Sequence, residues 1–264
     1  MTSVVRKVVR GQLRDAMRSR WLTVYALFFA LLTDGVLRFS GSDAKAILSL
    51  TTVVLIVIPL VTLVLSTIFV YNAREFTELL LAQPIRRSSL FAGLYLGLTV
   101  PLAGGFFSGV ALPFMLRGGG DPAQRGVLAT LLAIGVVLTA VFTAIAFWIA
   151  LRAEDRLRGL ATALGVWLAF GLLYDGAVLV VVAVFSDSPL ERPLLALSFA
   201  NPIDLGRMLM LLRLDVAALM GYTGAVFQRF FAGTTGVALA SAALAGWVLV
   251  PLTVSARLFR RKDF

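Results

Sequence analysis

Two aspartates stand inside long apolar stretches of the chain. Asp34 interrupts the first such stretch, and Asp175, in the run LLYDGAVL, lies about the middle of another. Paired carboxylates can activate water, as in intramembrane aspartyl proteases, but this chain has no GxGD motif. Both are therefore interpreted as intramembrane polar groups. Asp34 lies near the outer interface, and Asp175 either lines a dimer interface or pathway or is hydrogen-bonded to Thr, Ser or Tyr.

The residue types that the chain lacks exclude other chemistry. It has no cysteine and no histidine, so disulfides, thiolate or imidazole metal sites and Ser-His or Cys-His dyads cannot form within it. The run RGGGDP lacks the lysine of a phosphate loop. Met208, Met210 and Met220 carry thioethers that suit Cu(I), but residues two apart on a helix do not share a face. We expect no catalytic residue, no metal site and no cofactor in this chain.

The composition is that of a membrane protein. Hydrophobic residues make up 59% of the 264 residues, charged residues only 14%, and the mean hydropathy is +0.94. A soluble domain carries about 25% charged residues. We expect an all-α, polytopic chain that forms a single transmembrane domain over 1–264. Six runs reach about the 20 residues that a spanning helix needs; they are 21–39, 46–71, 90–116, 127–151, 160–185 and 236–259.

The basic residues indicate the orientation. If the N-terminus is cytoplasmic, the inner segments hold 16 of the 24 Lys and Arg residues and 6 of the 14 acidic residues, so the net charge is +10 inside and zero outside. This follows the positive-inside rule and predicts that both termini are cytoplasmic. Because topology accounts for the whole positive charge, we expect membrane lipids and no nucleic acid as partners.

The chain begins with a basic amphipathic segment. Arg6, Arg10, Arg14 and Arg18 recur at i+4 with valines and a leucine on the other side, which predicts an interfacial helix over 1–20. A signal peptide is the alternative, but no small-x-small cleavage site precedes Asp34, so an uncleaved first helix is favoured.

The segment 186–235 is external and has no run that spans convincingly, so we expect short helices in or just above the outer interface. In the stretch NPIDLGRML, Asn201 is predicted as N-cap, Pro202 as the first helical residue and Asp204 as the third. Asp204 and Arg207 are spaced i and i+3 and are expected to pair. The four residues form either a local salt bridge with its cap or a docking site for a periplasmic partner.

The segment 72–89, NAREFTELLLAQPIRRSS, is polar between two apolar runs. Asn72 and Glu75 have capping-box spacing. Phe76, Leu79 and Leu80 are predicted to form one apolar face, with Glu75 and Glu78 off it. The segment is therefore predicted to form a short amphipathic cytoplasmic helix.

The residues after this helix predict its end and its connection to the next span. Pro84 ends it, and Arg86 and Arg87 anchor the start of the third span. A short helix joined closely to two spans suits the transmission of force, whereas the alternative is a plain loop whose charges follow topology.

The run REFTELLLAQPIRRSSLFAGLYLG resembles the coupling segment of type-2 ABC-transporter permeases. NPIDLGRML and the ending VPLTVSARLFRRKDF resemble the NosY-type branch, the permease subunits of the copper-maturation ABC transporter for nitrous oxide reductase. The resemblance implies a coupling role for part of this segment, namely Arg74, Glu75, Phe76, Glu78, Leu79, Pro84 and Arg86.

The resemblance also implies an assembly in the bacterial inner membrane. It consists of a homodimer of this chain, two copies of a separate ATPase that binds ATP and Mg, and a periplasmic partner protein, with copper handled by the assembly. An exporter of a drug, lipid or glycan is the second interpretation. A stand-alone intramembrane enzyme or channel is the third.

Overall fold

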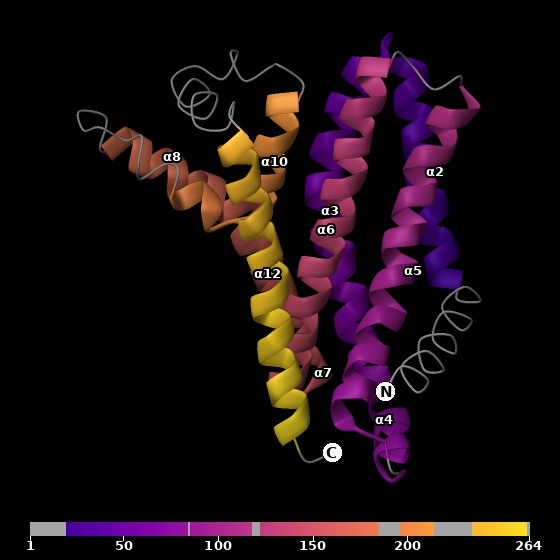
Figure 1. Ribbon diagram of the computed structural model, residues 1–264, viewed down its shortest axis with the longest axis vertical. Coiled ribbons are helices and arrows are strands. Elements are labelled where there is room, and N and C mark those ends of the chain that lie inside the picture. Colours follow the sequence, from indigo (N-terminus) through magenta and orange to yellow (C-terminus); the bar gives the residue numbers. More distant parts are fainter. Residues whose placement is uncertain (1–19, 84, 118–121, 185–195, 214–233, 263–264) are drawn as a thin grey trace.

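A computed structural model describes residues 20–83, 85–117, 122–184, 196–213 and 234–262. Every regular element in these ranges is a helix (Figure 1). The elements are α2 (Arg20–Phe39), α3 (Asp43–Asn72), α4 (Arg74–Leu81), α5 (Arg87–Leu116), α6 (Pro122–Arg152), α7 (Arg156–Leu168), the π-helix η1 (Ala169–Leu173), α8 (Tyr174–Val184), α10 (Pro202–Arg213) and α12 (Thr234–Arg261). The expected interfacial helix over 1–20 lies almost entirely outside the described residues.

The predicted all-α class and six spans are confirmed. Within the described ranges, six stretches are long and apolar enough to cross a membrane, and they begin and end within a few residues of the predicted runs. The fifth span joins α7, η1 and α8 over Arg156–Val184. Pro101 and Pro113 do not break the third span, because α5 runs unbroken through both. Neighbouring helices can satisfy the backbone groups that a proline frees in a membrane helix.

The bundle is built around α6. This helix contacts α3, α5, α7, α10 and α12, whereas α2 packs mainly on α5. The largest fully buried side chains include Phe29, Phe106, Phe142 and Phe147, and Phe29 meets Phe106 edge to face with ring centroids 5.2 Å apart. Offset and edge-to-face aromatic pairs add to the stability of such a core.

The two ends of the bundle carry different elements (Figure 1). At one end lies α4, and the end of α12 and the start of α7 lie at the same end of the bundle; we call this the α4 end. The other end holds α10, and there α8 leaves the bundle at an angle. The change in direction follows η1, whose wider π turn is a common cause of helix bends. No residue of α8 is buried.

Candidate functional site

The short helix predicted between the second and third spans exists as α4. It presents one face to the bundle and one outward. Thr77 is buried, and Leu80 and Leu81 pack against the core. The hydroxyl of Thr77 donates to the carbonyl of Ala73 at 2.7 Å, which satisfies this polar group in its buried position.

The three residues of the predicted apolar face do not all turn toward the bundle. Leu80 does face the core, but Phe76 is 45% exposed and Leu79 is 71% exposed. Glu75 and Glu78 are exposed beside them. The reason is that only Ala73 separates α4 from α3, so α3 sets which side of α4 turns inward. The outward side therefore mixes two acids with two large apolar side chains; we call these four residues the α4 outer face.

The predicted capping box is also wrong. Asn72 is the last residue of α3 and is exposed, and no side chain caps α4. The Ala73 N–H donates to the Phe69 carbonyl and the Thr77 N–H donates to the Ala73 carbonyl, both at 2.9 Å. Helical hydrogen bonds therefore continue across the joint, and the first turn of α4 needs no side-chain cap.

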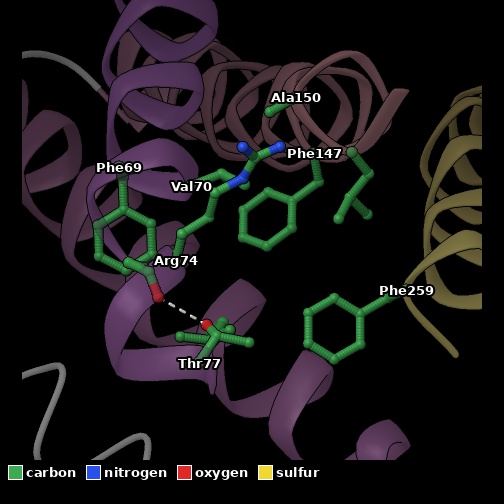
Figure 2. A pocket seen from close by; sticks show the side chains of 10 residues that line it. Phe69, Val70, Arg74, Thr77, Phe147, Ala150 and Phe259 are labelled. Atoms are coloured by element: carbon green, nitrogen blue, oxygen red, sulfur yellow. Dashed lines mark hydrogen bonds between the residues drawn. The ribbon is translucent and has the colours of Figure 1, made fainter. Parts of the chain in front are cut away.

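The inner side of α4 closes over a small apolar cavity (Figure 2). Phe147 of α6 and Phe259 of α12 point into it, and Thr77 and Arg74 lie at its α4 side. Arg74 is half-buried and its Nη1 donates to the Glu154 carbonyl at 3.3 Å. The cavity is lined by residues of α3, α4, α5, α6 and α12, so the inner side of α4 faces helices that are distant in sequence as well as α3.

The remaining coupling residues lie after α4. Pro84 is outside the described residues. Arg86 is exposed and precedes the first residue of α5. Arg87 donates from Nη1 to the carbonyls of Arg260 at 3.0 Å and Lys262 at 2.8 Å. Arg87 thus caps the end of α12, where a cation is favoured.

At the opposite end, the predicted start of α10 is confirmed. Asn201 Oδ1 accepts from the Ile203 N–H at 2.9 Å, and the helix begins at Pro202. The amide of Asn201 donates to the Phe170 carbonyl at 2.9 Å, next to a π turn that frees backbone groups. Asn201 therefore starts α10 and also ties it to η1.

Two acids share one arginine beside this cap. Arg207 Nη1 lies 3.0 Å from Asp175 Oδ2 and 3.1 Å from Asp204 Oδ1, and Asn201 donates to Asp204 Oδ2 at 3.3 Å. The predicted i, i+3 pair is thus present. The partner of Asp175 is Arg207, which neither interpretation of Asp175 included. We call Asp175, Asp204 and Arg207 the charge triad.

The burial of the residues at the start of α10 limits which of them a partner protein could contact. Asn201, Pro202 and Asp204 are buried within the chain, and α10 packs on α3, α6 and α12. Of the four predicted docking residues only Arg207, with 31% of its side chain exposed, reaches the surface. Docking of a periplasmic partner here stays a prediction, and in this conformation it would use Arg207.

Asp34 has two arginine partners. Its carboxylate lies 2.8 Å from Arg38 Nε and 2.7 Å from Arg117 Nη2, and it is about one-third exposed. The pair with Arg117 joins the end of α2 to the end of α5, whereas the pair with Arg38 lies within α2. The position fits the predicted outer interface, where a paired, partly exposed carboxylate costs little.

The charge triad predicts a pH dependence. Burial raises the pKa of Asp204 to about 6, with Asp175 adding to the rise and Arg207 opposing it. A carboxyl group whose folded-state pKa lies above its unfolded value stabilises the fold when protonated, and this contribution is lost as pH rises from about 4 through 6. We therefore compare the Tm of the Asp204→Asn variant with that of the parent at two pH values. The variant's Tm relative to the parent is expected to be about 2–4 °C higher at pH 7.5 than at pH 5.

Thermal unfolding in a mild detergent at both pH values measures this difference. The charged groups that face Asp204 are Arg207 on α10 and Asp175 on α8. Asp43→Asn, which removes a carboxylate in the first turn of α3, serves as the control. A Tm difference for Asp204→Asn that does not change with pH would contradict the raised pKa.

Among the described residues no three carboxylates gather as a metal site. Met210 is buried and Met208 packs beside Leu205, while Met220 is outside the described residues.

Sequence reasoning missed two groups of residues. Gly105 and Gly109 of α5, spaced i and i+4, lie against α2. This is the small-xxx-small pattern by which membrane helices approach closely, and the spacing could have revealed it. Tyr71, at the end of α3, bonds to a turn more than eighty residues away, and no local signal indicates that contact.

Taken together, six apolar spans and a charged helix between the second and third of them describe a multi-pass membrane protein. A family model described as ABC-2 family transporter protein matches residues 6–264. The chain belongs to this family and is an ABC-2 permease subunit of an ABC transporter. Family membership implies an ATPase partner and a dimeric assembly.

Two curated relatives share the whole length. A protein of Pseudomonas aeruginosa, described as "Probable ABC transporter permease protein NosY", is 30% identical over 275 aligned positions that cover 98% of each chain. A protein of Stutzerimonas stutzeri with the same description is 26% identical, with 97% of each chain covered. The predicted resemblance to permeases of the NosY type is confirmed.

Proposed function

We propose that a separate ATPase subunit docks on the α4 outer face and drives the permease by moving α4. The observation that carries this proposal is the exposure of Phe76 and Leu79 beside Glu75 and Glu78, on a helix whose other side lines a cavity shared with α3, α5, α6 and α12. Exposed aromatic and aliphatic side chains rimmed by charges are typical of protein interfaces. ATP and Mg bind to the ATPase, and the permease itself is not catalytic.

Movement of α4 would be transmitted directly to the membrane-spanning helices on either side of it. A single residue joins α4 to α3, and five residues, 82–86, join it to α5. Rigid-body motion of packed helices is a common form of switching transition. Closure of the ATPase would therefore displace the second and third spans of each permease copy and change the face at the other end of the bundle.

The charge distribution supports the orientation. The α4 end holds exposed arginines of α4–α5, α7 and α12, among them Arg86, Arg158 and Arg260. By the positive-inside rule this end is cytoplasmic. We therefore place the protein in the bacterial inner membrane with both termini in the cytoplasm and the charge triad toward the periplasm.

For the particular role, we propose copper-site maturation of nitrous oxide reductase. The support is full-length similarity to two proteins named NosY. In this role a homodimer with two ATPase copies exports a component or transmits a mechanical signal to a periplasmic partner protein, and the assembly rather than this chain handles copper.

The α4 outer face predicts a charge-dependent association. Glu75→Lys and Glu78→Lys, singly and together, are expected to weaken co-purification of the ATPase in mild detergent, with the double variant losing at least about tenfold. Both side chains are exposed and have no ion pair among the described residues. The loss is therefore expected without a change in Tm.

Asp43→Lys provides the matched control, because it makes the same charge change at the opposite end of α3. It should leave co-purification unchanged. Full retention of the ATPase by the Glu75→Lys/Glu78→Lys variant would remove the α4 outer face as the docking surface.

A further inference from the structure

The joint between α3 and α4 is bonded to the turn between α6 and α7. Tyr71 Oη lies 2.9 Å from the carbonyl oxygen of Ala153 and 3.1 Å from that of Asp155. Arg74 Nη1 donates to the carbonyl between them, that of Glu154. Tyr71 and Arg74 thus engage three consecutive carbonyls of the turn, directly after α6 ends at Arg152.

These bonds lie in the turn just after α6, where the Asp155 carbonyl also accepts from the Gly159 N–H at 2.9 Å as α7 begins. The last carbonyls of a helix have no partner within it and attract cations. Lys262, which follows α12, donates from Nζ to the Leu151 carbonyl at 2.7 Å. Burial lowers the pKa of this lysine, and the nearby Arg74 lowers it further. The end of α6 is therefore held from the α3–α4 joint and from the end of α12.

The Tyr71 side chain packs closely against the start of α7. Gly159 is buried against the Tyr71 ring, and a Cβ built on it would lie 2.3 Å from Tyr71 Oη and 2.7 Å from Cε2. No side chain fits between them without moving the ring. The Arg74 guanidinium lies 5.3 Å from the centre of the same ring, a cation–π distance that holds the two side chains together.

We propose that Tyr71, Arg74 and Gly159 form a latch that makes the fifth span follow the motion of α4. A displacement of the α3–α4 joint then moves the start of α7 together with it, and α7 leads through η1 to α8 and Asp175. Without the latch, α7 still packs along α3, but the α3–α4 joint has no bond to the turn before α7. This inference rests on the proposed function only in naming the ATPase as what moves α4; the latch itself belongs to the permease.

The chain has no native cysteine, so two introduced cysteines can carry spin labels without background. We place one label at Ala82, just after α4, and the other at Ala161 on α7, both exposed. A reference pair joins Ala82 to Leu96, an exposed residue of α5. Distance distributions are recorded for the full-length permease in lipid nanodiscs.

Tyr71→Ala and Gly159→Ala are each expected to widen the 82–161 distribution about twofold and to leave the 82–96 distribution unchanged. Gly165→Ala, on the same helix with no atom within 4 Å of its Cβ position, should change neither. In the Tyr71→Ala background, Gly159→Ala should add nothing, because the ring that it displaces is gone. Unchanged 82–161 distances in both variants, or equal widening of both pairs, would overturn the latch.

A second measurement uses the permease with its ATPase. Binding of ATP should shift the 82–96 distance in the parent and leave the 82–161 distance unchanged, because the latch moves α7 together with α4. Tyr71→Ala should keep the ATPase and the 82–96 shift and should gain a shift of the 82–161 distance. An 82–161 distance that responds alike in the parent and in Tyr71→Ala would overturn the latch. Failure of the ATPase to bind the parent would instead count against the proposed function, and the nanodisc measurement on the permease alone still decides the latch.

Discussion

Arg207→Gln is expected to destabilise the protein by about 2 kcal/mol, which lowers the Tm by about 4–8 °C. Arg207 is the shared partner of Asp175 and Asp204. Its loss leaves two carboxylates close together at the edge of an apolar bundle, where an unpaired charge costs up to about 3 kcal/mol. Because Arg207 and Asp175 are partly exposed, we take a value below that limit.

The triad predicts a specific non-additivity. Asp175→Asn alone leaves Arg207 paired with Asp204 and should cost well under half as much as Arg207→Gln. When Asp175→Asn is combined with Arg207→Gln, it removes one of the two unpaired carboxylates. The double variant should therefore recover part of the decrease in Tm. Thermal unfolding of the two single variants and the double variant measures this coupling.

Arg38→Gln is the matched control. Asp34 binds both Arg38 and Arg117, so it keeps one partner when Arg38 is removed, and Arg38 is 65% exposed. The expected cost is below about 0.5 kcal/mol. An Arg207→Gln variant no less stable than Arg38→Gln, or a double variant that loses the sum of the two single losses, would show that the triad does not stabilise the fold.

Local signals in the sequence predicted the elements that depend on local physics. The spans follow from apolar runs long enough to cross a bilayer. The start of α10 follows from Asn201, Pro202 and Asp204, whose roles depend only on neighbours within four residues. In both cases the residues that predict the element are the same residues that disfavour other conformations.

Predictions failed where packing against distant residues decides. The outward exposure of Phe76 depends on how α3 meets α4, and periodicity alone cannot tell which side of a short amphipathic helix faces the bundle. Asp175 and Arg207 are 32 residues apart, and the π turn that brings Asp175 toward α10 has no sequence pattern that we could use. The coupling role of α4 was reached through resemblance, and the structure adds which of its side chains are exposed.

Gly109→Ala is expected to lower the Tm by about 3–8 °C through separation of α2 from α5. A Cβ at Gly109 would lie 2.7 Å from the carbonyl oxygen of Ala26 and 2.8 Å from Phe29 Cβ. Both contacts are with rigid parts of α2, so no rotamer change relieves them and the helix itself must move. Helices in a bilayer associate largely through such close packing, since lipid competes for their apolar surfaces.

Gly104, five residues earlier on the same helix, gives the control because no atom lies within 4 Å of its Cβ position. Gly104→Ala should leave the Tm unchanged or raise it slightly, as replacement of an interior helical glycine by alanine favours the helix by up to about 1 kcal/mol. The two variants add the same methyl group to the same helix, so their difference isolates the contact with α2. Equal Tm values would mean that the close approach at Gly109 carries no part of the stability.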